Sequence, residues 1–395
     1  MSGNGLNTWL IIPHDPLVFR DGKPFTAVPG ARAQSVPFPF PSTVAGAVRT
    51  RSGAIQHGGV FPAGDQQIVS RVLGYRIVGP FLYSLGRHEL LLPAPRDAFF
   101  ATIEPDNERE ARLIPLQPRS RAFPNVQRNL PDDLQLVTLV EEVDGKAHPK
   151  APHFWRWSHA QVWLETPCVH QSVALSEWGL SHLPMDIRIH VSIDPGLRTA
   201  REGALFQTGG LTFVHAPVHE RRHPSLAEAE EFALLVQTDA HPFAAGVDAL
   251  GGERRLVMWQ RAEVSLPACP DSVREAILST RRGRLMLVTP ACFNQGFRPT
   301  WVLEHPSGVK LRVVAAAVGR PVHVSGWDYD KQRPKETRRL APAGSVYFFE
   351  ITQGDRKAIE RFVETVWMQP ISDDGQDRRD GFGVALLGTW NEQEG

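Results

Sequence analysis

The chain has 395 residues, a length that suggests about two or three domains, with cores large enough to need no disulfide or metal support. Its 43 Lys and Arg residues are balanced by 43 Asp and Glu residues, which excludes a histone-like polycation but not a local basic groove. Glycine and proline are abundant without a period, and 42% of the residues are hydrophobic. A disordered or fibrous chain is therefore excluded as well.

Cysteine usage and the N-terminal segment indicate the compartment. Cys168, Cys269 and Cys292 are widely spaced, so neither a disulfide framework nor a cysteine zinc site is expected. The first residues lack the charged segment and the apolar run of a signal peptide. No apolar stretch reaches the roughly 18 residues that a membrane span requires. We therefore expect a cytoplasmic protein without membrane contact.

The first half of the chain is predicted to combine short strands with one helix. Residues 9–12 are an apolar run that predicts a strand, and a loop rich in glycine and proline follows. Ser42 follows a proline and is a suitable N-cap, so a helix is expected to begin there. Further strands are predicted near residues 77–85 and 98–104. Recurrent prolines and alternating charged patches in residues 105–160 predict an extended insertion or linker with one hairpin.

The second half is predicted to be rich in strands. In residues 186–193, aliphatic and polar side chains alternate with the period of a strand. Helices are expected at residues 272–282 and 355–368, and the second has an apolar stripe that should face the core. Strands with few helices indicate an α+β fold of two sheet-based units joined near residues 170–185. The other predicted strands are residues 205–214, 232–237, 256–264, 285–289, 311–318 and 346–351.

The start of the first helix is a candidate anion-binding site. Free backbone N–H groups and the helix dipole favour a negative charge there, and Thr43 is small enough to let a phosphate approach. Arg49 lies roughly opposite the apolar stripe that contains Val44, so its side chain would face a ligand or solvent. From these residues alone, an ordinary capped helix beginning at Ser42 explains the pattern more simply.

A basic run near residue 335 is a second candidate. Trp327 and Tyr329 precede it, and cations next to aromatic rings suit single-stranded nucleic acid, since charge pairs with phosphate and rings stack on bases. A solvated charged loop is an equally good interpretation of the same residues. The basic residues, which surround a single acidic Glu336, are Lys331, Arg333, Lys335, Arg338 and Arg339.

Near the C-terminus, Gly381, Phe382 and Gly383 form a glycine-rich segment. With Gly388 they approach a dinucleotide-binding pattern, but the spacing is wrong and no helix is expected to follow. They also approach an RNA-recognition strand pattern, which would require a basic and a second aromatic residue at the flanking positions. Taken alone, the segment predicts a turn or bulge.

Metal-dependent hydrolysis is an alternative suggested by histidines. His215, His219 and His223 are spaced four apart, but Pro217 disfavours the helix that would align them on a metal. The pair His14–Asp15 is typical of some phosphohydrolases, although its flanking prolines favour a turn. No nucleophile elbow, phosphate-binding loop or zinc-protease motif occurs in the sequence. We therefore predict neither a metal nor a cofactor.

A set of short motifs occurs in a fixed order along nearly the whole chain, except that residues 105–160 carry none of them. The motifs are, in order, residues 15–25 (DPLVFRDGKPF), 40–49 (FPSTVAGAVR), 190–194 (HVSID), 202–206 (EGALF), 251–255 (GGERR), 289–293 (TPACF), 319–322 (GRPV), 325–328 (SGWD), 342–347 (PAGSVY) and 381–383 (GFG). Together they resemble one family, the third Cmr subunit, a RAMP-superfamily protein of type III-B CRISPR effector complexes.

This resemblance implies two ferredoxin-like, RNA-recognition-like domains. Residues 1–175 would form the first, with the proline-rich insertion at about residues 105–160, and residues 176–395 the second, ending in a glycine-rich loop. The family is non-catalytic and binds the repeat-derived 5′ handle of the guide RNA for antiviral defence. Its expected partners are that RNA, the large polymerase-like subunit and the backbone RAMP subunits.

The resemblance also implies where RNA would bind. It makes the helix start at Ser42 a phosphate cradle and the basic run a backbone contact. A guide-processing endoribonuclease of the same superfamily is the alternative, with His14 or His323 as its acid or base. The implied RNA-binding residues are Arg20, Lys23, Ser42, Thr43, Arg49, Lys331, Lys335, Arg338, Arg339, Gly381, Phe382 and Gly383.

Overall fold

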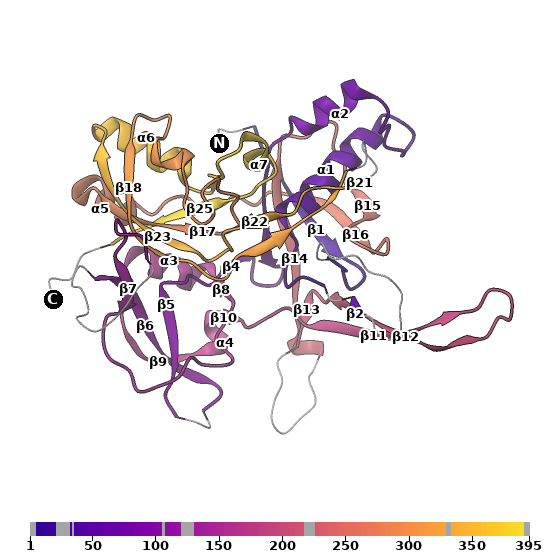
Figure 1. The fold of residues 1–395 in the computed structure, drawn as a ribbon, viewed down its shortest axis with the longest axis horizontal. Coiled ribbons are helices and arrows are strands. Elements are labelled where there is room, and N and C mark those ends of the chain that lie inside the picture. Colours follow the sequence, from indigo (N-terminus) through magenta and orange to yellow (C-terminus); the bar gives the residue numbers. More distant parts are fainter. Residues whose placement is uncertain are drawn as a thin grey trace. The chain divides into compact units, whose positions relative to one another are not determined.

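The computed structural model describes residues 5–20, 32–33, 35–104, 107–119, 130–216, 226–328 and 333–390. Lys23, Lys331, His219 and His223 lie outside these residues. The model mixes helices with several antiparallel sheets (Figure 1), which confirms the predicted α+β class. Within the described residues, no helix is long and apolar enough to cross a membrane.

The chain forms two compact units, each assembled from three stretches of sequence. The first unit combines Met1–His88, His182–Val264 and His323–Arg338. The second unit is built from the intervening stretches, which are Glu89–Ser181, Ser265–Val322 and Arg339–Gly395. The domain boundary expected at residue 175 lies shortly before one of the points at which the chain passes between units.

The first unit is organised around strand β1, which pairs antiparallel with β14 on one side and with β16 on the other. Strand β3 pairs with β14, and β15 pairs with β16, so the order is β3-β14-β1-β16-β15. Ile11 of β1 is fully buried. These elements are β1 (Asn7–Pro13), α1 (Pro41–Ile55), α2 (Gln66–Leu73), β3 (Ile77–Ser84), β14 (Glu230–Thr238), β15 (Gly246–Ala249) and β16 (Leu256–Ala262).

Smaller elements surround this sheet in the first unit. The largest is a hairpin of β11 and β12, which projects from the rest of the unit (Figure 1). These elements are β2 (Arg32–Ala33), β11 (Met185–Ile193), β12 (Ala200–Leu211), β13 (Val214–His215), η1 (Leu226–Glu228), β20 (Trp327–Asp328) and β21 (Arg333–Pro334), while β19 (Val322–Val324) and β22 (Arg338–Leu340) straddle the passages between units.

The second unit contains a sheet of order β18-β23-β17-β25-β24, again antiparallel throughout. Helix α6 is capped by Asp355, and the predicted apolar stripe is buried, with Phe362 and Val363 fully enclosed. These elements are α5 (Asp271–Thr280), β17 (Arg282–Leu287), η2 (Trp301–Leu303), β18 (Lys310–Ala317), β23 (Val346–Gln353), α6 (Arg356–Val366), β24 (Gln369–Pro370), α7 (Gly375–Arg379) and β25 (Val384–Gly388).

The two units share a ferredoxin-like strand order. The four main strands are β1, β3, β14 and β16 in the first unit and β17, β18, β23 and β25 in the second. When they are numbered 1 to 4 along the chain, both sheets have the order 2-3-1-4, so the connection from strand 1 to strand 2 and that from strand 3 to strand 4 each cross one strand. In the first unit, the first crossover contains α1 and α2, whereas the second crossover, residues 239–255, contains only β15. In the second unit the arrangement is reversed: the first crossover, residues 288–309, contains only η2, and the second crossover contains α6.

The prediction that residues 105–160 form a linker with one hairpin is wrong. Strand β6 lies at the centre of a four-stranded sheet with β5, β7 and β9. Its two prolines misled the prediction, but β6 changes partner at Pro115, the last residue paired with β5. The remaining elements of the second unit are β4 (Glu89–Pro93), β5 (Ala98–Thr102), β6 (Glu110–Arg119), β7 (Leu136–Leu139), β8 (Phe154–Arg156), α3 (Trp157–Glu165), β9 (His170–Ala174), α4 (Leu175–Trp178) and β10 (Gly179–Leu180).

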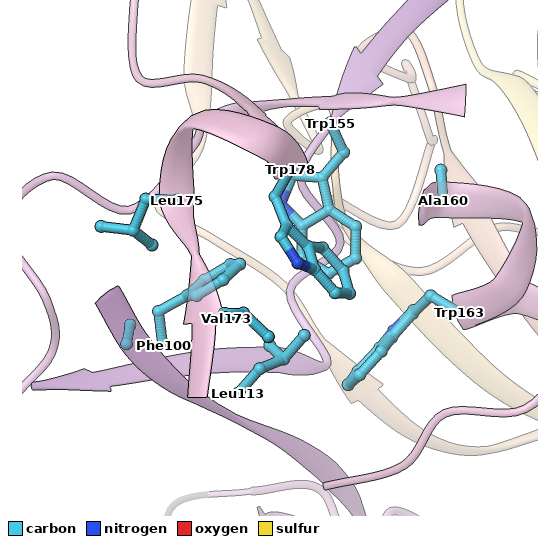
Figure 2. Close-up of a cluster of buried hydrophobic side chains, with 9 residues drawn as sticks. Phe100, Leu113, Trp155, Ala160, Trp163, Val173, Leu175 and Trp178 are labelled. Carbon is cyan, nitrogen blue, oxygen red and sulfur yellow. The ribbon is translucent and has the colours of Figure 1, made fainter. Parts of the chain in front are cut away.

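A cluster of aromatic side chains forms the core of this region (Figure 2). The ring centroids of Trp155 and Trp178 are 4.8 Å apart at 80°, and those of Trp155 and Trp163 are 5.6 Å apart at 81°. Phe100 of β5 meets Trp155 edge-on from the sheet side. Edge-to-face pairs of this kind stabilise a core beyond the area they bury, so the region is a folded layer of the second unit.

Candidate nucleic-acid interface

Helix α1 begins without a side-chain cap. Its N-cap residue is Phe40 and Pro41 is the first helical residue, so the prediction that Ser42 is the N-cap is wrong. Proline is favoured at that position because its fixed φ suits the first turn and an N–H is not needed there. Helix α2, by contrast, is capped by the carboxylate of Asp65. With no acidic residue in its first turn, α1 presents Ser42 and Thr43, both half-buried, at an end that still favours an anion.

Arg49 does not face a ligand as expected. Its side chain is buried, and the guanidinium donates to the backbone carbonyls of Val72 (Nε, 3.0 Å), Leu73 and Tyr75 (both Nη2). These carbonyls lie at and beyond the C-terminal end of α2, where a cation is favoured by the dipole. Arg49 therefore ties α1 to α2. Helix phase alone placed Arg49 on an open face because no local pattern predicted helix α2.

The opening motif is held by backbone contacts on both sides. The N–H of Phe19 donates to Ser35 Oγ at 2.7 Å, and the carbonyl of Val18 accepts from the N–H of Gly252 at 2.7 Å. Phe19 and Val18 are buried, whereas Arg20 is exposed. The predicted site residue Arg20 therefore lies at the surface of the first unit, on a segment whose backbone is fixed.

The described part of the basic run is presented on and after a short hairpin. Arg333, Lys335 and Arg339 are exposed, and Arg338 is half-buried. The backbone of Lys335 is fixed, since its N–H donates to Gly326 O at 2.7 Å and its carbonyl accepts from Ser325 Oγ at 2.8 Å. Among the described residues, no carboxylate pairs with the Arg333 or Lys335 side chain. Neither cation is therefore neutralised within this part of the chain.

The glycine-rich segment is not presented for binding. Gly381, Phe382 and Gly383 are all buried in the second unit. Their N–H groups donate to Arg378, Asp377 and Pro290, and their carbonyls accept from Thr289 Oγ1, Ser372 Oγ and the Ile371 N–H. Gly381 and Gly383 have φ of +90° and +82°, a region that favours glycine. The expectation that these residues face RNA is not met, because every backbone group is already paired.

The histidines do not assemble a metal site in the described residues. Asp15 accepts a hydrogen bond from the Leu256 N–H at 3.2 Å, which gives it a structural role beside His14. Elsewhere in the described chain, no group of three or more His, Cys, Asp or Glu side chains could hold a metal ion. His323 is exposed on β19.

The hairpin of β11 and β12 is a surface that sequence reasoning missed. Its predicted alternation is confirmed, but the aliphatic face is exposed rather than covered: Ile189 is 74% exposed and Ile187 is 56% exposed. Leu205, 59% exposed, lies opposite Val191 on the same face. Period-two alternation is identical for a covered and an open face, so only the structure distinguishes them. A row of exposed aliphatic side chains on an edge strand is typical of an interaction surface.

Comparison with known proteins places these features in a family. The model of the family described as "CRISPR-associated protein (Cas_Cmr3)" matches residues 9–390. The chain belongs to the Cas_Cmr3 family. This confirms the resemblance to the third Cmr subunit of type III-B CRISPR effector complexes that the sequence motifs indicated. No curated protein that was searched matches the chain.

Several solved structures are similar to this Cmr3-family chain. A chain of a type III-B Cmr-beta complex bound to cognate target RNA and AMPPnP is 18% identical, with 90% of this chain and 88% of that chain covered and a TM-score of 0.42. A second structure of Cmr-beta bound to cognate target RNA gives 16% identity, 86% coverage of both chains and a TM-score of 0.43. A Csm3-Csm4 subcomplex of the type III-A interference complex gives 10% identity, 98% and 100% coverage and a TM-score of 0.36.

Proposed function

We propose that this Cmr3-family chain is a non-catalytic subunit that binds the 5′ repeat-derived handle of the guide RNA and docks the large polymerase-like subunit beside the backbone RAMP subunits. The observation that carries the proposal is the pair Arg333 and Lys335, exposed on a segment with a fixed backbone and not paired with a carboxylate in the described residues. Unneutralised cations are available to RNA phosphates.

Further support comes from the other exposed features of the first unit. Arg20 is a further exposed cation of the first unit. The uncapped start of α1 offers the backbone N–H of Ser42, whereas the Thr43 N–H already donates to Phe40 O at 3.0 Å. Recognition of a single-stranded handle needs phosphate contacts together with apolar surface for splayed bases. The aliphatic face of the β11–β12 hairpin is such a surface.

The experiment is to assemble the effector complex with its repeat-spacer array and to measure guide-RNA retention against salt. Arg333→Gln/Lys335→Gln should release RNA at lower salt, with the slope of log affinity against log salt reduced by about 1.4, or about 0.7 per phosphate contact. Arg71→Gln, at an exposed arginine of α2, is the matched control. If the wild-type complex carries no RNA with a repeat-derived 5′ end, the proposed function is wrong.

A further inference from the structure

The loop between β4 and β5 presents an exposed arginine, Arg96. Among the described residues, no carboxylate or carbonyl pairs with its side chain. The next residue, Asp97, is buried and forms its ion pair with Arg284 instead. A guanidinium carries five N–H donors, so in this part of the chain the donors of Arg96 remain open to a ligand.

Arg96 is held in place by packing rather than by a charge partner. Its backbone N–H donates to Gly344 O at 2.8 Å. A Cβ added at Gly319 would lie 3.3 Å from Arg96 Nε, 3.4 Å from its Cζ and 3.2 Å from Pro342 Cγ. The guanidinium therefore lies against the bare backbone of Gly319, where a side chain would crowd it. A charged group whose orientation is fixed in advance loses less entropy when it binds.

The three chain segments that meet at Arg96 contain a single acidic residue, the buried Asp97. Arg320 directly follows Gly319 and is exposed, and its side chain has no ion pair or hydrogen bond within the described part of the chain. Segments without exposed carboxylates do not repel successive negative charges, so a polyanion is favoured here over a single protein carboxylate. The three segments are residues 90–103, 315–322 and 339–349.

We propose that Arg96, positioned by Gly319, binds a phosphodiester of the guide RNA. This assignment rests on the proposed function, because it names a phosphate contact within it, on the second unit. A planar guanidinium donates two parallel hydrogen bonds to a phosphate, which a lysine ammonium does not reproduce. Gly319 serves the contact because its missing side chain leaves room for the guanidinium at the surface.

The test measures guide-RNA affinity against salt in the assembled complex. Arg96→Gln should lower the affinity about tenfold and reduce the slope of log affinity against log salt by about 0.7, because one phosphate contact is lost. Arg96→Lys keeps the charge but not the paired donors, so it should retain the slope and lose part of the affinity. Lys357→Gln, at an exposed cation of α6 in the same unit, is the matched control and should change neither quantity.

Gly319→Ala separates the position of the guanidinium from its charge. The φ of Gly319 is not in the left-handed region, so alanine brings no backbone strain there. The added Cβ displaces the guanidinium without removing it, and the affinity should fall about threefold. In an Arg96→Gln background the same change should have no further effect, because the Cβ acts through Arg96. An equal loss in both backgrounds would overturn the positioning role of Gly319.

The outcomes separate this contact from the proposed function. If the wild-type complex holds handle RNA and Arg96→Gln leaves both affinity and salt slope unchanged, the contact is wrong while the proposed function stands. If Arg96→Gln instead releases a protein subunit without changing the RNA slope, Arg96 binds a protein carboxylate and the contact is again wrong. A wild-type complex that holds no guide RNA overturns both.

Discussion

The two units have the same strand order but use their motif residues differently. In the second unit, residues of the motifs at 289–293, 342–347 and 381–383 are buried, and their polar groups are paired within the unit. In the first unit, residues 15–20 of the opening motif meet the motif at 251–255 at a surface loop that presents arginines. From sequence, Arg20 of the first unit and Gly381, Phe382 and Gly383 of the second unit are predicted to lie at the same RNA site. The two sets of motif residues differ in whether their polar groups are paired within their own unit, and the residue types alone do not show this difference.

Arg284 and Arg281 of the second unit contrast in the same way with Arg333 of the first unit, although Arg49 of the first unit is also buried and bonded to backbone carbonyls. In the second unit, Arg284 is buried and donates to Asp97, to Thr389 O at 2.6 Å and to Trp163 O at 2.7 Å. Arg281 donates to the carbonyls of Ile351 and Gly354. Arg333 of the first unit is exposed, with no carboxylate partner in the described residues. The second unit should therefore lose stability when these groups are changed, and the first unit should lose RNA binding.

The largest effect is expected at Arg284. Arg284→Met leaves the Asp97 carboxylate buried without its charge partner, which should lower the free energy of unfolding by about 3–5 kcal/mol. Chemical denaturation followed by tryptophan fluorescence measures this, because Trp163 Nε1 donates to the same carboxylate. Asp97→Asn keeps an acceptor oxygen and should cost less. A loss below about 1 kcal/mol in Arg284→Met would show that this pair does not secure the second unit.

A pH-dependent loss is expected from His305, also in the second unit. Burial, followed by the nearby Arg378 guanidinium, lowers the pKa of His305 from 6.5 to about 4. Between these values the unfolded chain binds the proton and the folded chain does not, so stability falls as the pH is lowered through this window. The loss should approach about 3 kcal/mol near pH 4. His305→Asn keeps an acceptor for the Ser307 N–H, and its stability relative to wild type should rise as the pH is lowered through this window. A difference in unfolding free energy between variant and wild type that does not change with pH would contradict the assignment.

Gly383 tests whether the glycine-rich segment is structural. In Gly383→Ala, the added Cβ would lie 2.9 Å from the Ser372 nitrogen at a φ of +82°. We expect a loss of about 1–3 kcal/mol and no change in the salt slope of RNA binding once folded protein is compared. Gly375→Ala has no close contact and no positive φ, so it should be nearly neutral. A changed slope in Gly383→Ala would return this segment to the RNA site.

Sequence patterns predicted the fold where local signals were strong. The alternation of residues 186–193 and the apolar stripe of α6 gave elements within about two residues of those observed. Two prolines hid β6: Pro115 lies where the strand changes partner, but Pro118 lies within the segment paired with β7. Among the candidate site residues, the roles of Arg49 and Phe382 depend on packing against segments distant in sequence. No local pattern carries that information.

The smallest effect is expected at the helix starts, where the contrast between units can be tested directly. Asp355→Ala removes the carboxylate that accepts the Ala358 N–H at the start of α6 and should cost about 1 kcal/mol. Ser42→Ala removes no cap from α1 and should stay within about 0.5 kcal/mol of wild type. If Ser42 contacts the handle, Ser42→Ala should nevertheless weaken guide-RNA retention in the assembled complex. A stability loss at Ser42 that equals the loss at Asp355 would instead show that both helix starts serve the fold, and the phosphate cradle at α1 would lose its support.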